Sequence, residues 1–197
     1  MKGIEYVLAL YNMAHIELAR ELGITRQNIN QWIKGKGKIP KKYLPVLSKM
    51  FNVPEEYFQK EINDIDKLII QKEKLKMELK PSINEYQLRF SVDTKDLEEE
   101  PVYNSNSLNQ IEVEIKKAKV IKDIREALSS FDNDIELQIF EQIALLLKKY
   151  RAEKIFGYTV DAVSHYYSVL PEWVGDPESD DFVEEFLELA QKYDGTE

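Results

Sequence analysis

Residues 23–40 read GITRQNINQWIKGKGKIP, and this stretch decides the fold of the N-terminal region. It opens with Gly23, a residue type that often ends a helix in a left-handed turn. Thr25 follows, and its hydroxyl makes it a good N-cap for the next helix. Gly35 then ends the pattern of polar residues interrupted by apolar ones. The stretch therefore predicts a tight turn followed by a short helix over 26–34.

A second short helix is predicted just upstream, over 14–22, where Ile16, Ala19 and Leu22 fall on one side. Two helices joined by a tight glycine turn are typical of a helix-turn-helix. A small residue is expected at Ala19, because the helices cross closely there. The apolar residues of the later helix, Ile29 above all, would hold it on the core.

The polar side chains of helix 26–34 are predicted to face outward. Arginine offers two parallel donors to guanine, while asparagine and glutamine offer a donor and an acceptor to adenine. The candidates for reading bases are Arg26, Gln27, Asn28, Asn30 and Gln31. Phosphate contacts position a protein on the duplex, and the candidates for them are Thr25, Lys34, Lys36, Lys38 and Lys41. The alternative is a solvated polar helix followed by a lysine loop.

Three further helices complete the expected N-terminal domain. Helical spacing of apolar residues predicts a first helix near 3–12, and Pro40 predicts the start of a fourth helix that runs to Phe51. A short fifth helix is expected near 55–58. Residues 1–60 are therefore predicted to form a five-helix domain.

Residues 15–58 resemble the lambda-repressor/Cro (XRE-type) helix-turn-helix family. The matching positions are Leu18, Ala19, Gly23, Thr25, Ile29, Trp32, Gly35, Pro40 and Phe58. The resemblance covers about residues 1–60 and implies a DNA-binding domain there. In that family the positions matching Arg26, Gln27 and Gln31 commonly read bases. The position matching His15 usually carries a glutamine that touches phosphate, so His15 is expected to do so.

Charge is distributed unevenly along the chain. The formal net charge is −9, yet residues 1–60 hold ten Lys/Arg and five Asp/Glu, against 17 and 31 in residues 61–197. A basic head on an acidic body indicates a polyanionic partner at one end, although chance variation in surface charge would look the same.

The remainder of the chain is also predicted to be mainly helical, so the fold class is mostly α. We expect a connecting helix over 61–81, with an apolar seam that Lys72 interrupts. A linker or extended arm is expected over 82–107, with a possible short strand at 86–92. An acidic helical domain is expected over 108–197, for oligomerisation or partner binding. Its helices are predicted at 108–128, 135–150, 159–169 and 178–193.

Little in the sequence indicates chemistry. With no cysteine and two histidines, we expect no enzyme, no cofactor and no metal. The acids Asp132, Asp134, Asp176, Asp180 and Asp181 are expected to be solvated or to cap helices. The aromatic residues Tyr158, Tyr166, Tyr167 and Trp173 would line a pocket or belong to an ordinary core. No apolar run reaches the length of a membrane span, and a cytoplasmic location is expected.

The sequence thus favours a sequence-specific DNA-binding transcriptional regulator, and within that class it favours a repressor of phage or mobile-element type. Its expected partners are double-stranded DNA and a second copy of the chain, as a homodimer or higher homo-oligomer that reads two half-sites. The alternative is an inhibitor or antitoxin-like module. That module would bind a protein partner through its acidic C-terminal domain and use the helix-turn-helix for autoregulation.

Overall fold

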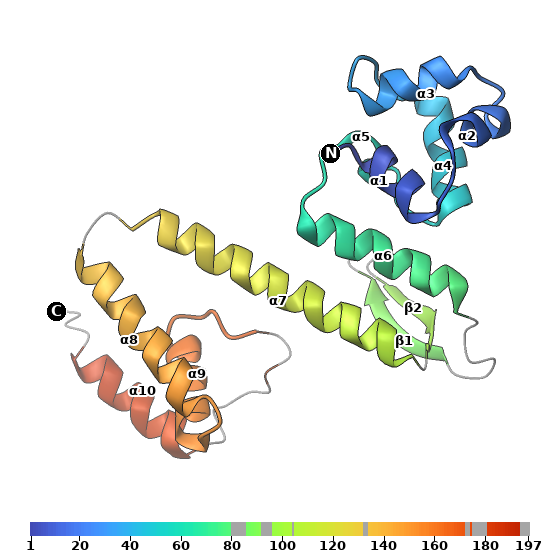
Figure 1. Cartoon of the computed structure of the whole chain (residues 1–197). Helices are drawn as coiled ribbons and strands as arrows, with labels where there is room; N and C mark the ends of the chain where they lie inside the picture. Colours follow the sequence, from blue (N-terminus) through green and yellow to red (C-terminus); the bar gives the residue numbers. More distant parts are fainter. Residues whose placement is uncertain are drawn as a thin grey trace. The chain divides into compact units, whose positions relative to one another are not determined.

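The computed structural model describes residues 1–79, 86–91, 96–103, 105–131, 134–171, 174 and 181–193 (Figure 1). The chain is mostly helical, which confirms the predicted fold class. It divides into two compact units, Met1–Ala127 and Leu128–Glu197, which are described separately below.

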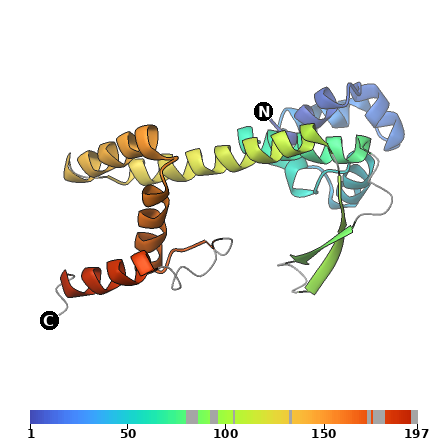
Figure 2. The same ribbon diagram turned by 90° about the horizontal axis from the view of Figure 1, so that it is seen from below.

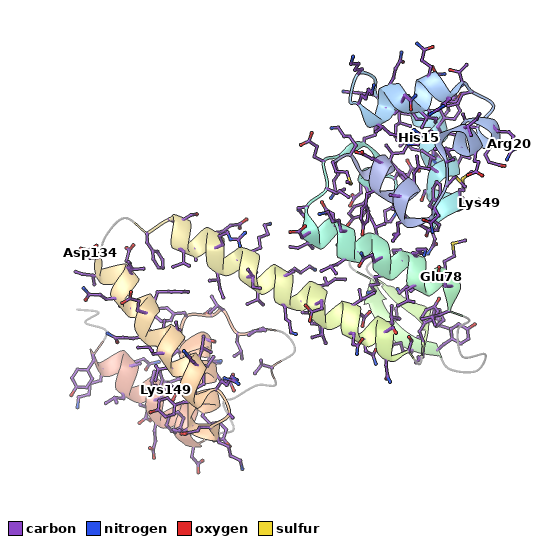
Figure 3. The ribbon with its side chains drawn as sticks, in the orientation of Figure 1. His15, Arg20, Lys49, Glu78, Asp134 and Lys149 are labelled. Atoms are coloured by element: carbon purple, nitrogen blue, oxygen red, sulfur yellow. The ribbon has the colours of Figure 1, made fainter. Side chains whose placement is uncertain are left out.

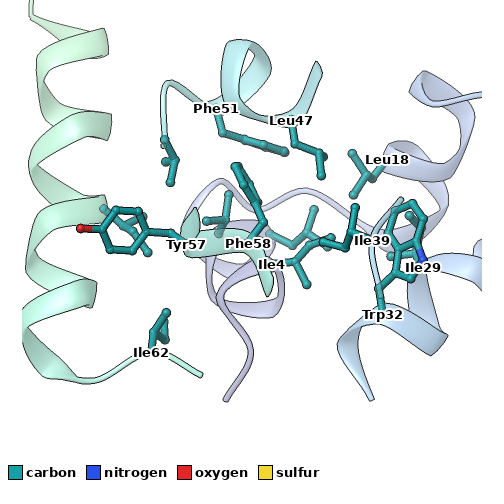
Figure 4. Packing of buried hydrophobic residues seen from close by; sticks show 14 of the residues in the cluster. Ile4, Leu18, Ile29, Trp32, Ile39, Leu47, Phe51, Tyr57, Phe58 and Ile62 are labelled. Carbon is teal, nitrogen blue, oxygen red and sulfur yellow. The ribbon is translucent and has the colours of Figure 1, made fainter. Parts of the chain in front are cut away.

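The five short helices predicted for the N-terminal region are present. Their bounds are α1 (Gly3–Leu10), α2 (His15–Glu21), α3 (Arg26–Ile33), α4 (Leu44–Phe51) and α5 (Glu56–Gln59). They enclose a core in which Phe51, Phe58 and Ile4 lie near the middle of the cluster shown in Figure 4. Phe51 contacts Tyr11 edge-on at 5.0 Å between ring centroids and Phe58 at 6.2 Å.

Hydrogen bonds fix the N-terminal residues to the segment that follows α5. The Gly3 N–H donates to the Lys60 carbonyl at 3.0 Å, and the Ile62 N–H donates to the Met1 carbonyl at 3.2 Å. A Cβ atom on Gly3 would lie 1.7 Å from the Tyr57 carbonyl oxygen. Only glycine therefore allows α1 to approach α5 this closely.

The fourth helix begins later than predicted. Pro40 precedes a 3-10 turn, η1 (Lys41–Tyr43), and α4 starts at Leu44 with Pro45 in its first turn. Pro45 has no N–H, so a helix that began at Pro40 would lack the hydrogen bond that residue 45 should donate. The prediction of Pro40 as the helix start was therefore wrong by four residues.

The segment expected to connect two domains instead packs on the helix-turn-helix core as α6 (Asp64–Glu78). Ile70 is fully buried, and the Gln71 amide donates to the Tyr6 hydroxyl at 2.7 Å. Buried Asp66 accepts from Lys60 at 2.9 Å and from the Asn63 N–H at 3.0 Å. Ile69, which belonged to the expected apolar seam, is only partly buried against this core, whereas Ile70 beside it is fully buried.

A β-hairpin occupies much of the region in which a linker or extended arm was expected. β1 (Tyr86–Ser91) confirms the possible strand, and β2 (Asp96–Pro101) pairs with it antiparallel, with Leu88 opposite Glu99. Figure 2 shows the two strands as a ribbon pair near the start of α7 (Asn106–Ser129). β2 was not predicted because its sequence, DLEEEP, is acidic and leads directly into the asparagine-rich stretch that is typical of a loop.

The second unit contains α8 (Asp134–Tyr150), α9 (Lys154–Tyr166) and α10 (Asp181–Tyr193). α9 and α10 pack together, with Ala162 and Val183 buried and the rings of Tyr158 and Phe182 at 6.2 Å. Tyr166 and Tyr167 contact each other at 5.1 Å. The predictions for Asp132, Trp173, Asp176 and Asp180 lie outside the described residues.

Candidate DNA-binding face

The turn between α2 and α3 has the geometry that the opening stretch predicted. Gly23 has φ +65°, the left-handed conformation that favours glycine. The Ile24 N–H donates to the Ala19 carbonyl at 2.9 Å, and the Gly23 N–H donates to the Arg20 carbonyl at 3.2 Å. This pair of hydrogen bonds is a Schellman motif, which ends α2 and turns the chain at once into α3.

The next residues hold α3 against the core. The Thr25 hydroxyl accepts from the Asn28 N–H at 3.4 Å and caps the helix, as predicted. Ile29 is fully buried, Trp32 is 7% exposed, and Ala19 of the crossing helix is 3% exposed. Because Ile29 and Trp32 share one side of α3, the polar residues of this helix are left on the other side.

The predicted base-reading residues all lie outside the fully buried side of α3, with a gradient of exposure. Arg26, Gln27 and Gln31 are exposed, whereas Asn28 and Asn30 are half-buried. Side chains at the start of such a helix are the ones that can reach base edges in a major groove. Arg26 and Gln27 occupy the first two helical positions, so they have the most open access.

His15 and Asn30 contact each other, which the sequence did not indicate. His15 Nδ1 and Asn30 Oδ1 are 2.9 Å apart, so this ring nitrogen carries the proton and donates to the amide oxygen. The contact leaves the Asn30 amide N–H₂ as the donor available to a ligand. Asn30 therefore couples a residue predicted to touch phosphate with the helix predicted to read bases.

A shallow groove of about 610 Å³ lies along α1 and the connection to α2, and it reaches the starts of α2 and α3. His15 and Arg26 both line it, together with Ile16 and Glu5. Figure 3 marks His15 and Arg20 toward opposite ends of α2, with side chains of α2 and α3 projecting outward. The starts of α2 and α3 therefore border one groove, through His15 and Arg26.

The basic loop after α3 is held by its own glycine turn. Gly35 has φ +67°, and the Lys36 N–H donates to the Gln31 carbonyl at 2.9 Å. Ile39 is buried, so the loop returns to the core and holds its lysines outward. The exposed lysines are Lys34, Lys36, Lys38 and Lys41. A Cβ on Gly37 would make only ordinary contact, at 3.9 Å from Gln31, so this second glycine is not required by the fold.

Two further cations border this face. Lys2 lies beside the loop, because its Cε would be 3.5 Å from a Cβ on Gly35. Arg20 is exposed on α2. Lys2 is far from the loop in sequence, and it is held there by the hydrogen bonds that fix the N-terminus and by its ion pair with Glu61 at 3.7 Å. The charge count for residues 1–60 includes Lys2 and Arg20, but it cannot show that they lie beside this face.

Comparison with protein families gives one match, which covers this region. Residues 14–62 are similar to the family model described as bacterial toxin YdaS. Comparisons with curated proteins and with solved structures give no match. The matched segment contains α2 to α5 and ends before α6. The likeness therefore concerns the helix-turn-helix region, which is about a quarter of the chain.

Within the described ranges, no helix combines the length and the apolar character needed to cross a membrane.

Proposed function

We propose that the protein is a sequence-specific DNA-binding regulator of phage or mobile-element type that acts as a repressor. The observation that carries the proposal is the pairing of a Schellman turn at Gly23 with an outward face of Arg26, Gln27 and Gln31. Arginine and amide side chains are the groups that distinguish base pairs in the major groove. The lysines after α3 would neutralise phosphates beside it.

The test is selection of duplexes from a random pool by the full chain, followed by binding titrations with the selected sequence. Arg26→Ala and Gln27→Ala should each relax preference at one or two base pairs, by about 1–3 kcal/mol for a lost bidentate pair. Lys36→Ala, the matched control, should weaken all sequences alike and reduce the salt dependence. Equal losses for all sequences with all three variants would contradict direct base readout.

A regulator of this kind needs two copies, and α8 is the element we propose for pairing them. Ile139, Ile143 and Leu146 lie on one side of α8 and are each 44–53% exposed. The first turn of α8 is acidic, with Asp134 and Glu136, and its last turn is basic, with Lys148 and Lys149. Figure 3 marks Asp134 and Lys149 at the two ends of this helix. Antiparallel pairing of two copies would cover the apolar side and oppose acids to lysines.

Sedimentation of the full chain tests this pairing. Ile139→Glu with Ile143→Glu should shift the protein to monomer, because two carboxylates would then enter the apolar contact. Gln138→Glu adds a carboxylate at an exposed position of α8 outside the apolar side and should leave the dimer intact. A wild-type chain that sediments as a monomer at tens of micromolar would refute the proposed pairing.

A second candidate function is a growth-inhibiting protein, which the description of the matched family as a bacterial toxin favours. Controlled expression of the full chain in a bacterial host, with growth as the readout, tests it. Growth arrest that persists in the combined Arg26→Ala and Gln27→Ala variant would favour action through another surface. Arrest that disappears in that variant would favour action through DNA.

A further inference from the structure

The residue that interrupts the apolar pattern of α6 lines a cavity. Lys72 and Lys76, four positions apart, lie on one face of α6, and Lys116 and Lys119 lie on one face of α7. All four line a cavity of about 540 Å³ within the first unit. We name this cavity the lysine pocket.

The lysine pocket has a built floor and polar walls. Leu108 and Ile115 of α7 line it and are only 5% and 8% exposed, so the floor is apolar and packed. Val102 and Tyr103 lie before α7 and add an apolar and an aromatic surface. Side-chain amides come from Gln87 of β1 and Asn109 of α7.

One carboxylate faces the four ammonium groups among the described lining residues. Glu112 Oε1 lies 2.8 Å from Lys72 Nζ, and this ion pair joins α6 to α7. The hydrogen bond from Lys72 lowers the pKa of Glu112, and the charges of Lys76 and Lys116 lower it further. Three lysines therefore act on the same carboxylate, and the pocket keeps an excess of positive charge. A cleft lined by one sign of charge concentrates ligands of the other sign.

We propose that the lysine pocket binds a phosphorylated small molecule of nucleotide size. Ligand pockets in proteins are typically about 300–1,000 Å³, so a single inorganic phosphate would leave most of this one unfilled. Lysine binds phosphate as a point charge, and the apolar floor with Tyr103 offers a surface to a base or another planar group. The pocket lies outside the candidate DNA-binding face, so the proposal does not depend on DNA reading by α3.

A ligand held in this way would have a mechanical consequence. Its phosphates would contact lysines of both α6 and α7, as Glu112 already does with Lys72. α6 packs directly on the helix-turn-helix core. Ligand binding would therefore fasten the start of α7 to the DNA-binding part of the first unit.

Calorimetric titration of the full chain with ATP, GTP, adenosine and inorganic phosphate tests the proposal. At least one nucleotide should bind at least tenfold more tightly than adenosine or phosphate. Lys76→Gln with Lys116→Gln should weaken that binding at least tenfold. Lys74→Gln with Lys117→Gln is the matched control, because these lysines lie on the same helices but pair with Glu78 and Glu114 outside the pocket. The control should change affinity less than twofold.

Several results would overturn the proposal. One is the absence of binding heat with either nucleotide at millimolar concentration. Another is an equal loss of nucleotide affinity in the two double variants, which would indicate non-specific attraction. A third result concerns DNA. If the Lys76→Gln, Lys116→Gln variant loses as much affinity for a selected duplex as Lys36→Ala does, these lysines contact the DNA backbone. Circular dichroism checks folding of each variant, and the single Lys119→Gln serves if the double variant unfolds.

Discussion

The two units of this chain differ in how they use their apolar residues. In the first, Phe51, Phe58 and Ile70 are almost fully buried, and α6 completes the core. In the second, α8 carries apolar residues of which Ile135 is 70% exposed and Leu145 is 55% exposed. An apolar face of this kind is typical of an interaction site. The first unit thus has a closed apolar core, whereas α8 in the second unit leaves apolar side chains exposed, which supports the proposed pairing of two copies.

The largest effect is expected from removing a large side chain from the closed core. Phe58→Ala should destabilise the first unit by about 3–5 kcal/mol, because it deletes buried surface and leaves a cavity. Leu146→Ala, at a position that is 44% exposed on α8, should change monomer stability by less than about 0.5 kcal/mol. Denaturant unfolding followed by circular dichroism measures both at a concentration below dimer formation. Similar losses would contradict the contrast between the units.

The next largest difference between the two units is expected when one glycine in each is replaced by alanine. Gly3→Ala should destabilise the first unit by about 1–3 kcal/mol, since the new Cβ would overlap a backbone carbonyl that must then move. Gly157→Ala in α9 meets nothing within 4 Å and should stabilise the second unit by up to about 1 kcal/mol through helix propensity. Thermal unfolding should thus move in opposite directions. A neutral Gly3→Ala would mean that α1 and α5 are not held as closely as described.

The turn of the helix-turn-helix should be more tolerant. Gly23→Ala should cost about 1–2 kcal/mol, because alanine would adopt φ +65°. Gly37→Ala, whose Cβ would make ordinary contacts, should be close to neutral. Denaturant midpoints of the two variants, with duplex binding measured alongside, check the expectation. A loss for Gly37→Ala as large as that for Gly23→Ala would show that the loop has a conformational demand beyond its glycine turn at Gly35.

The smallest effect concerns pH. The Tyr11 hydroxyl donates to the Phe51 carbonyl at 2.6 Å, and burial, with Glu78 and Glu73 nearby, raises its pKa to about 12. Above the ordinary tyrosine pKa of about 10, the unfolded chain loses this proton more readily than the folded chain. Stability from Tyr11 is therefore complete below about pH 10 and falls as pH rises toward 12. Tyr11→Phe should flatten this alkaline loss in unfolding titrations, and an unchanged slope would contradict the assignment.

The sequence predicted the helix-turn-helix well because its signals are local. The glycine turn, the threonine cap and the burial of Ile29 and Trp32 all follow from residues close together in the chain, and all are present. The exposure of Arg26, Gln27 and Gln31 followed from the same periodicity. Their roles at DNA stay predictions.

Features that depend on distant residues were not predictable. The His15–Asn30 hydrogen bond spans two helices, and the position of Lys2 depends on the hydrogen bond from Gly3 to Lys60. β2 has an acidic sequence and gains its strand conformation by pairing with β1. In the sequence, Lys72 interrupts an apolar seam without a visible reason. The structure gives the reason, because Lys72 forms an ion pair with Glu112 of α7.

The packing of α6 has a consequence for how such a protein can be rearranged. The family match ends at residue 62, yet the core that supports it needs Ile70, which is fully buried, and the Gln71–Tyr6 hydrogen bond. A recombination event that joins this helix-turn-helix region to a different C-terminal segment would expose that core if the crossover fell at residue 62, where the family match ends. The heritable module is therefore longer than the recognisable motif, and exchange that preserves folding requires a crossover beyond Glu78.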